Sequence, residues 1–304
     1  MEHQQHNFEK LPDIETIQKI ILEISCADFS QLSYTKLIQK IRSLVFIPFA
    51  SAKLKSGHYI ERARINKPDQ IFYSEKDLSY RTDYENIKTY GRANVPHNSL
   101  FYGAYESEAI ALPRYVNLME TSEIFRNLET NNVDNADFIM TVGKWKIINE
   151  MEIVEVVFDE KSIENSVDIQ RAFEFHSERL KNELPQFVVQ FQAILKFFSN
   201  QFAKKNIKSH FDYMPSAAYT DLAINWRRFP GIAYPSVKTE FKGQNVVLSP
   251  SAVDANLQLE VVSMFRVLKK GKNTTVIPMR TAIDFGPMNT RFKWIDTNNE
   301  DFTI

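Results

Sequence analysis

The chain has 304 residues, of which 43% are hydrophobic and 12% aromatic. This length and composition allow a sizeable core, in one large domain or in two smaller ones. The 37 lysines and arginines nearly balance 38 aspartates and glutamates, for a net charge of -1. A broad nucleic-acid-binding face needs a surplus of cations, so we expect no direct nucleic-acid partner.

A single cysteine, Cys26, excludes a disulfide framework within the chain and suits a reducing compartment. Cys26 stands in an amphipathic apolar stretch, so we expect a buried and inert thiol. The polar first residues lack the apolar centre of a signal peptide. No window of 18 residues is both uncharged and apolar, so we expect no membrane partner and a cytoplasmic location.

The first half of the chain begins with helical periodicity and then changes to short, partly alternating segments. Isoleucines and leucines recur at helical spacing between residues 13 and 49, which predicts two helices separated by a short turn. Residues 51–57 are typical of a linker. Beyond the linker we expect strands at 58–65, 70–73 and 99–105, a polar loop at 74–90, and a helix over 106–128. Pro113 is an awkward residue inside that helix.

The second half contains a long helical region followed by further strands. Residues 163–206 carry an aromatic stripe at helical spacing, which indicates helix packing more strongly than a cofactor site. We expect strands at 138–147, 153–158, 231–237 and 245–248, short helices at 216–225 and 253–259, and a hairpin joining 260–268 to 275–282. The tail after Pro287 is expected to be irregular.

Because strands and helices do not alternate regularly, the pattern predicts an α+β fold and not a doubly wound sheet. We expect a helical N-terminal extension over residues 1–50 and a main domain over 51–304, with a helical insertion at about 163–206. The common phosphate-binding loops, G-x-G-x-x-G and G-x-x-x-x-G-K-[ST], are absent from the sequence. The six histidines are scattered, so no metal is expected.

Four segments carry residues suited to a binding site. Tyr59-Ile-Glu-Arg-Ala-Arg-Ile65 is a predicted strand that places Arg62 and Arg64 on one face. Gly91-Arg-Ala-Asn joins Arg92 to the aromatic strand that contains Tyr102. Leu118-Met-Glu-Thr-Ser122 lies on the following helix, and Gly231-Ile-Ala-Tyr-Pro-Ser236 leads into Gly243-Gln-Asn-Val246.

Together, in this order, these segments resemble the RES domain, a family named for an arginine, a glutamate and a serine. Its members commonly read R-x-N-x-P-G before a tyrosine-containing strand, then a helix with glutamate, and much later G-I-x-Y-P-S with a downstream G-x-N-V. The resemblance spans roughly residues 58–268. It implies an ADP-ribosyltransferase-like mixed β core with NAD as the substrate, either cleaved by hydrolysis or phosphorolysis or used for ADP-ribose transfer to a protein. It also implies a possible antitoxin partner with a helix-turn-helix domain.

The chemistry of breaking the nicotinamide–ribose bond assigns tasks to these residues. The reaction passes through an oxocarbenium-like state, and its leaving group is already cationic. Guanidinium groups suit pyrophosphate binding, for which Arg62, Arg64 and Arg92 are candidates. Tyr102 and Tyr234 suit stacking and hydrogen bonding. The catalytic set is therefore predicted as Arg62, Glu120 and Ser236, with Ser236 bonding to the carboxamide or to a ribose oxygen.

The glutamate is the least determined member, because the family spacing falls near Pro113, which has no acidic group. Glu120 lies about two helical turns further on and therefore on a similar face. Glu106 and Glu108 are the alternatives. If none of the three enters the site, we expect the protein to bind NAD without cleaving it. Pro113 at the family's glutamate position also leaves open a catalytically inactive RES-like interaction module. Without the resemblance, Arg62 and Arg64 are read as exposed strand charges, Tyr102 as core and Ser236 as a strand end.

Overall fold

The computed structural model describes residues 10–122, 135–271, 273–282, 291–297 and 302–303. It has a mixed α and β architecture with one large sheet, which confirms the predicted α+β class at that coarser level. The sheet order is β1-β5-β6-β7-β3-β2-β4-β8-β9-β10, with β11 paired to β9. Strands β5 and β6 are parallel, and the other paired neighbours are antiparallel.

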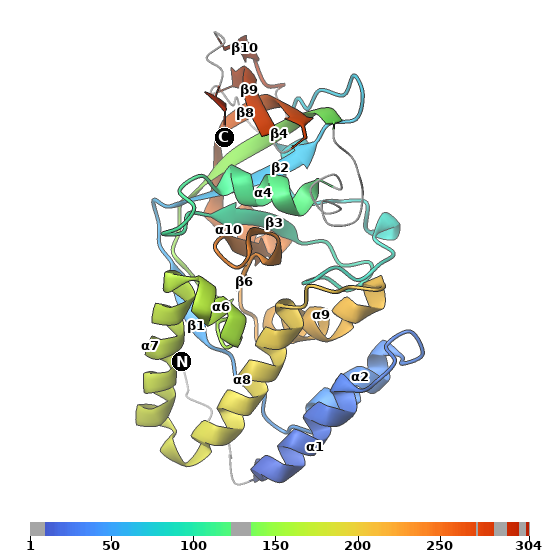
Figure 1. Ribbon diagram of the computed structural model, residues 1–304, viewed down its shortest axis with the longest axis vertical. Helices are drawn as coiled ribbons and strands as arrows, with labels where there is room; N and C mark the ends of the chain where they lie inside the picture. The colour runs from blue at the N-terminus through green and yellow to red at the C-terminus, as the bar shows by residue number, and fades with distance from the viewer. Residues whose placement is uncertain (1–9, 123–134, 272, 283–290, 298–301, 304) are drawn as a thin grey trace.

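Helices gather at one end of the molecule, and the long strands extend toward the other (Figure 1). The helices are α1 (Ile14–Ser25), α2 (Tyr34–Arg42), α3 (Glu75–Leu78), α4 (Pro113–Thr121), α6 (Glu160–Asn165), α7 (Val167–Glu183), α8 (Val188–Phe202), α9 (Met214–Asp221) and α10 (Pro250–Asn256). The strands are β1 (Ser51–Leu54), β2 (Tyr59–Ile65), β3 (Phe101–Tyr105), β4 (Asn135–Ile147), β5 (Met151–Glu155), β6 (Gly231–Pro235), β7 (Gln244–Leu248), β8 (Leu257–Lys270), β9 (Asn273–Ala282), β10 (Ile295–Asp296) and β11 (Phe302–Thr303).

Several sequence-based boundaries were wrong for identifiable physical reasons. The expected linker at 51–57 contains β1, which pairs with β5 through Ser51–Leu54 and so gains strand structure from a distant partner. No strand forms at 70–73. The helix expected from residue 106 begins at Pro113, where proline fits the first helical position because its missing N–H has no intrahelical partner there. Cys26 is exposed at the end of α1, not buried as predicted.

The two faces of the sheet are set by strand alternation. Glu61 on β2 pairs with Ala104 on β3, and Ala104 pairs with Asn245 on β7, so these three residues share one face. Helix α4 packs on this face, where Asn117 Nδ2 donates to the Glu61 carbonyl. Arg62 and Phe101 belong to the opposite face, whose core includes Trp145.

The aromatic stripe of α8 belongs to the core, as the sequence indicated. Phe191, Phe198 and Phe202 are almost fully buried, and the Phe198 ring stacks on Tyr219 of α9 at 4.3 Å between centroids. Helices α1 and α2 contribute Ile17, Ile24, Leu37 and Ile41 to the same cluster. The first two helices and α8 are therefore stabilised by one common hydrophobic core.

Replacing Leu37 by alanine is expected to lower the free energy of unfolding by about 2–5 kcal/mol, because the side chain is fully buried in this cluster. Leu22→Ala on α1 is the matched control, since Leu22 is 62% exposed and should change stability by less than about 0.5 kcal/mol. Urea unfolding followed by circular dichroism measures both. Equal effects would contradict the inclusion of α2 in the common core.

Candidate functional site

Glu120, in the last turn of α4, accepts hydrogen bonds from two residues distant in sequence. Ser236 Oγ donates to Glu120 Oε1 over 2.7 Å, and Asn245 Nδ2 donates to the same oxygen over 3.1 Å. Ser236 is fully buried and directly follows β6, and Asn245 lies on the adjacent β7. Among the described residues, Glu120 Oε2 has no hydrogen-bond partner, so one carboxylate oxygen is fixed and the other is available to a ligand.

The turn that precedes β3 positions Tyr102. The hydroxyl of Tyr102 donates to Asn94 Oδ1 over 2.7 Å, and the backbone N–H of Gly91 donates to the Asn94 carbonyl over 3.0 Å. A Cβ at Gly91 would lie 2.4 Å from Asn94 Oδ1, so any other residue there would displace the side chain that holds Tyr102. Burial raises the pKa of Tyr102, which keeps its hydroxyl protonated and able to donate.

Tyr234 forms a buried wall beside Glu120. Its ring packs on Phe202 at 5.0 Å between centroids. Burial raises the pKa of Tyr234 well above its ordinary value, and the nearby Tyr102 and Glu120 raise it further. The positive charge of Arg92 lowers the pKa of Tyr234. Tyr102 and Glu120 therefore both lie within electrostatic range of Tyr234.

Arg62 reaches the cluster from the opposite face of the sheet. Its Nη1 donates to the Tyr102 carbonyl over 2.7 Å, and its guanidinium lies 5.1 Å from the centroid of Phe101. The Nε of Arg62 is buried without a hydrogen-bond partner among the described residues. Burial lowers the pKa of Arg62 to about 10, and the charge of Arg64 contributes. The guanidinium of Arg62 stays cationic at neutral pH. Because it is buried, the interpretation of Arg62 as an exposed strand charge is wrong.

The other two predicted arginines hold backbone carbonyls. Arg64 Nη1 donates to the Asp77 carbonyl in α3, and its guanidinium lies 5.0 Å from the centroid of Phe72. Arg92 Nη1 donates to the Phe202 carbonyl, and both of its terminal nitrogens lie 3.3 Å from the Lys204 carbonyl. A cation suits these positions because carbonyls at a helix C-terminus carry partial negative charge.

The predicted residues therefore fall into two groups. The structure brings Glu120 and Ser236 into direct contact, and Tyr102, Tyr234 and Arg92 lie within electrostatic range. Arg62 contacts Tyr102 through its carbonyl, whereas Arg64 is directed to α3. The alternatives to Glu120 lie elsewhere: Glu108 pairs with Arg171, and Glu106 lines the cavity described below.

Two residues of this site had no role in the sequence-based interpretation. Asn245 stands in the Gly243-Gln-Asn-Val246 segment, which was noted as a motif without a task for its amide. Tyr213 receives the guanidinium of Arg92 at 5.0 Å from its ring centroid. The alternation of side chains along residues 245–247 shows in the sequence that Asn245 and Val247 share one face of their strand. Only the strand order adds that this face is the one with Glu120, so Asn245 could not be assigned to the site from sequence alone.

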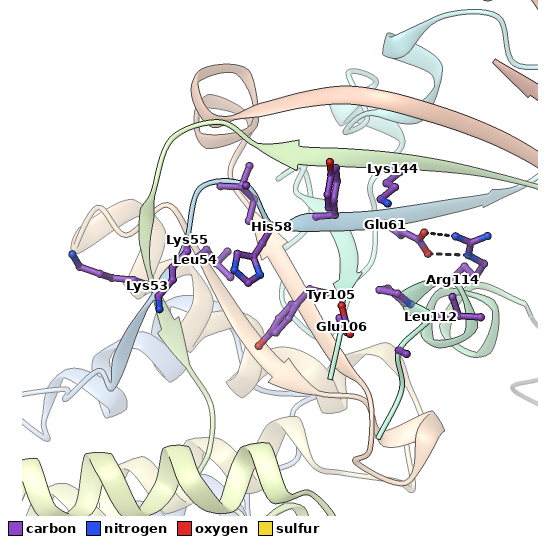
Figure 2. A pocket seen from close by; sticks show the side chains of 15 residues that line it. Lys53, Leu54, Lys55, His58, Glu61, Tyr105, Glu106, Leu112, Arg114 and Lys144 are labelled. Atoms are coloured by element: carbon purple, nitrogen blue, oxygen red, sulfur yellow. Dashed lines mark hydrogen bonds and ion pairs between the residues drawn. The ribbon is translucent and has the colours of Figure 1, made fainter. Parts of the chain in front are cut away.

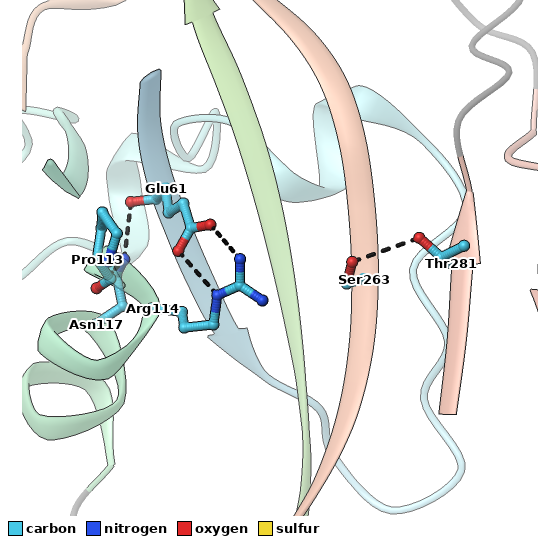
Figure 3. Close-up of polar contacts among 6 residues, drawn as sticks. All are labelled: Glu61, Pro113, Arg114, Asn117, Ser263 and Thr281. Atoms are coloured by element: carbon cyan, nitrogen blue, oxygen red, sulfur yellow. Dashed lines mark hydrogen bonds and ion pairs between the residues drawn. The ribbon is translucent and has the colours of Figure 1, made fainter. Parts of the chain in front are cut away.

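A separate cavity lies at the beginning of α4 (Figure 2) and has a volume of about 580 Å³. Its walls come from β1, β2, β4 and the segment before α4. The start of α4 is fixed by an ion pair in which Arg114 Nη2 lies 2.8 Å from Glu61 Oε1 (Figure 3). Glu61 is 3% exposed, so this pair ties α4 firmly to β2.

Comparison with protein-family models and with curated proteins gives no match to the chain. In the described part of the chain, no helix has both the length and the apolar character needed to cross a membrane. The described residues likewise include no group of three or more histidine, cysteine, aspartate or glutamate side chains placed to hold a metal ion.

Proposed function

We propose that this protein is a RES-type enzyme with an ADP-ribosyltransferase-like core that cleaves the bond between nicotinamide and ribose in NAD. The observation that carries the proposal is the hydrogen bonding of Glu120 to Ser236 and Asn245. It joins the candidate glutamate and the candidate serine, from segments 116 residues apart. Arg62 supplies the cation and donates a hydrogen bond to the Tyr102 carbonyl.

The reaction follows from these groups. The C1′–N1 bond breaks, and its electron pair neutralises the positively charged nicotinamide nitrogen, so no general acid is required. Positive charge develops on the ribose, where the unpartnered Oε2 of Glu120 stabilises it. Water or phosphate then forms the new bond at C1′ and releases a proton to solvent. Ser236 and Asn245 hold the carboxylate, so it needs little reorganisation as the charge develops.

Binding of the dinucleotide is assigned to the cationic and aromatic groups. Arg62 has an unused buried donor and suits a phosphate oxygen, because charge-assisted hydrogen bonds are stronger in a largely buried site. Arg92, whose hydrogen bonds go to the Phe202 and Lys204 carbonyls, lies over the Tyr213 ring beside Tyr102, and this stacked pair suits a planar ring of the ligand. Arg64 is left out of this assignment, because it is committed to the end of α3.

Purified protein incubated with NAD is expected to release nicotinamide, measured by liquid chromatography. Reactions with and without inorganic phosphate separate the two routes, since phosphorolysis yields the 1″-phosphate of ADP-ribose and hydrolysis yields ADP-ribose. Radiolabel retained on a protein would instead indicate an ADP-ribosyltransferase. Nicotinamide release no faster than in buffer, under every condition, would contradict the proposal and favour an inactive interaction module.

A further inference from the structure

The cavity at the start of α4 carries a net positive lining that the proposed reaction does not use. Its charged lining residues are Lys53, Lys55, Glu61, Glu106, Arg114 and Lys144. Two of the cations are neutralised by neighbouring acids, because Arg114 pairs with Glu61 and Lys53 pairs with Glu150. Among the described residues, neither Lys55 nor Lys144 has an ion-pair partner within 4 Å. The remaining acid, Glu106, is exposed.

Lys144 is placed at the cavity by the pairing of β4 with β2. It lies opposite Glu61 in the regular register of these strands, so the two residues share one face of the sheet. Its ammonium lies 4.1 Å from the centroid of the Tyr59 ring. The neighbouring carboxylates are engaged by other groups, because Glu61 pairs with Arg114, and Glu260 pairs with Lys146 at 3.1 Å and accepts from the Tyr59 hydroxyl. Lys144 therefore retains charge available to a ligand.

The other lining residues are suited to the apolar or aromatic part of a ligand whose anionic group lies near Lys144. Leu54, Leu112, Pro113 and Ile147 provide apolar contacts, and Tyr59 provides an aromatic face. The hydroxyl of half-buried Tyr105 has no hydrogen-bond partner among the described residues, and burial raises its pKa, so it remains a donor. Figure 2 shows Tyr105, His58 and Lys144 around the same space. A volume of about 580 Å³ is typical of small-molecule pockets.

The N-terminal end of helix α4 also favours an anionic ligand in this cavity. The helix begins at the cavity with Pro113, and no side chain in the described part of the chain caps its first turn. The N-terminal end of a helix favours anions because its first N–H groups lack partners within the helix. Two unpaired lysines and this helix end together match a phosphate monoester, which carries a charge of about -1.5 to -2 at neutral pH.

We propose that the cavity between β1, β2, β4 and the start of α4 binds a small aromatic or heterocyclic phosphate monoester. Lys144 binds the phosphate, Lys55 adds positive charge at the opposite side of the cavity, the hydroxyl of Tyr105 donates to the ligand, and Tyr59 and Leu112 contact its ring. This site is separate from the Glu120 cluster, although both are built on α4. Its occupancy does not depend on NAD cleavage.

Phenyl phosphate is the probe, and its binding to the full chain is measured by isothermal titration calorimetry at constant ionic strength. We expect saturable binding, and about tenfold weaker binding by Lys55→Gln/Lys144→Gln. Lys19→Gln/Lys181→Gln is the matched control, because it removes the same charge from exposed positions outside the cavity. Lys55→Glu, at an exposed position, provides a second test should the change at Lys144 disturb the sheet.

Phenol and benzoate identify the chemistry that is recognised, and both are expected to bind more weakly than phenyl phosphate. Absence of phenyl phosphate binding would overturn the proposal. So would equal binding by Lys55→Glu and the wild-type chain, or binding that is lost in Arg62→Met but kept in the lysine variants. Equal binding of phenol or benzoate would overturn the assignment to phosphate monoesters. None of these outcomes bears on nicotinamide release, so failure here is distinct from failure of the proposed function.

Discussion

Glu120→Gln is expected to lower kcat/KM for nicotinamide release by about 10³-fold, while the protein stays folded. Glutamine has the same shape and retains an oxygen that accepts from Ser236 and Asn245, so the local hydrogen bonds can persist. What is lost is the negative charge facing the developing positive charge on ribose. Because that charge exists mainly in the transition state, the effect should appear in kcat more than in KM.

Glu108→Gln is the matched control for this experiment. Glu108 was an alternative catalytic candidate in the sequence, and it lies in an exposed ion pair with Arg171 at 2.6 Å. Exposed pairs contribute little to stability, so this variant is expected to keep wild-type activity. Retained activity in Glu120→Gln together with its loss in Glu108→Gln would reassign the catalytic carboxylate. Equal activity of both variants and wild type would contradict a catalytic carboxylate in this helix region.

Arg62→Met is expected to abolish NAD cleavage and, in addition, to raise the free energy of unfolding by about 1–3 kcal/mol. The guanidinium is buried with one hydrogen bond and an unpartnered Nε, so its desolvation is poorly compensated. Methionine keeps contact with the Phe101 ring without carrying charge. A stabilising change that removes activity is the behaviour expected of a residue retained for function.

The pH dependence of that stability difference follows from the lowered pKa of Arg62. Burial lowers the pKa of Arg62 to about 10 in the folded chain, below its value in the unfolded chain, so the unfolded chain binds the proton more tightly. Between these two values, raising the pH stabilises the native wild-type chain, whereas Arg62→Met lacks this contribution. The advantage of the variant should therefore be largest below pH 10 and shrink above it. Thermal unfolding measured at pH 8 and above pH 10 checks this; a variant less stable than wild type at both would contradict the argument.

The local order of elements was largely predictable from sequence, because hydrophobic periodicity records which face of a segment is buried. The hairpin of β8 and β9, the strand β2 and the packing role of α8 all follow from such patterns. Strand β1 did not, because its four residues become a strand only by pairing with β5, about 100 residues away. The position of Pro113 was visible, but not its role as the first residue of α4.

For the candidate site, residue types were more predictable than residue tasks. The motif order grouped Glu120, Ser236 and Tyr102, whose contacts depend on the neighbouring positions of β6, β7 and β3. Arg64 and Arg92 have the chemistry of phosphate ligands, and the structure uses them at helix ends. Arg64 and Arg92 bind these carbonyls because of how α3 and α8 pack in the fold. The spacing of the arginines along the chain does not predict that packing.

The pairing between β2 and β3 divides the sheet into two mechanical units. These strands share one residue pair, Glu61 with Ala104, whereas the pairings on either side run over five to seven residues. Arg62 belongs to one unit, and Tyr102 and Asn245 belong to the other. A rotation about this narrow junction breaks fewer hydrogen bonds than one elsewhere in the sheet. Helix α4 spans this junction, because Arg114 and Asn117 bind Glu61 on one side and Glu120 binds Ser236 and Asn245 on the other. The hydrogen bonds of α4 therefore limit how far the two units can rotate against each other.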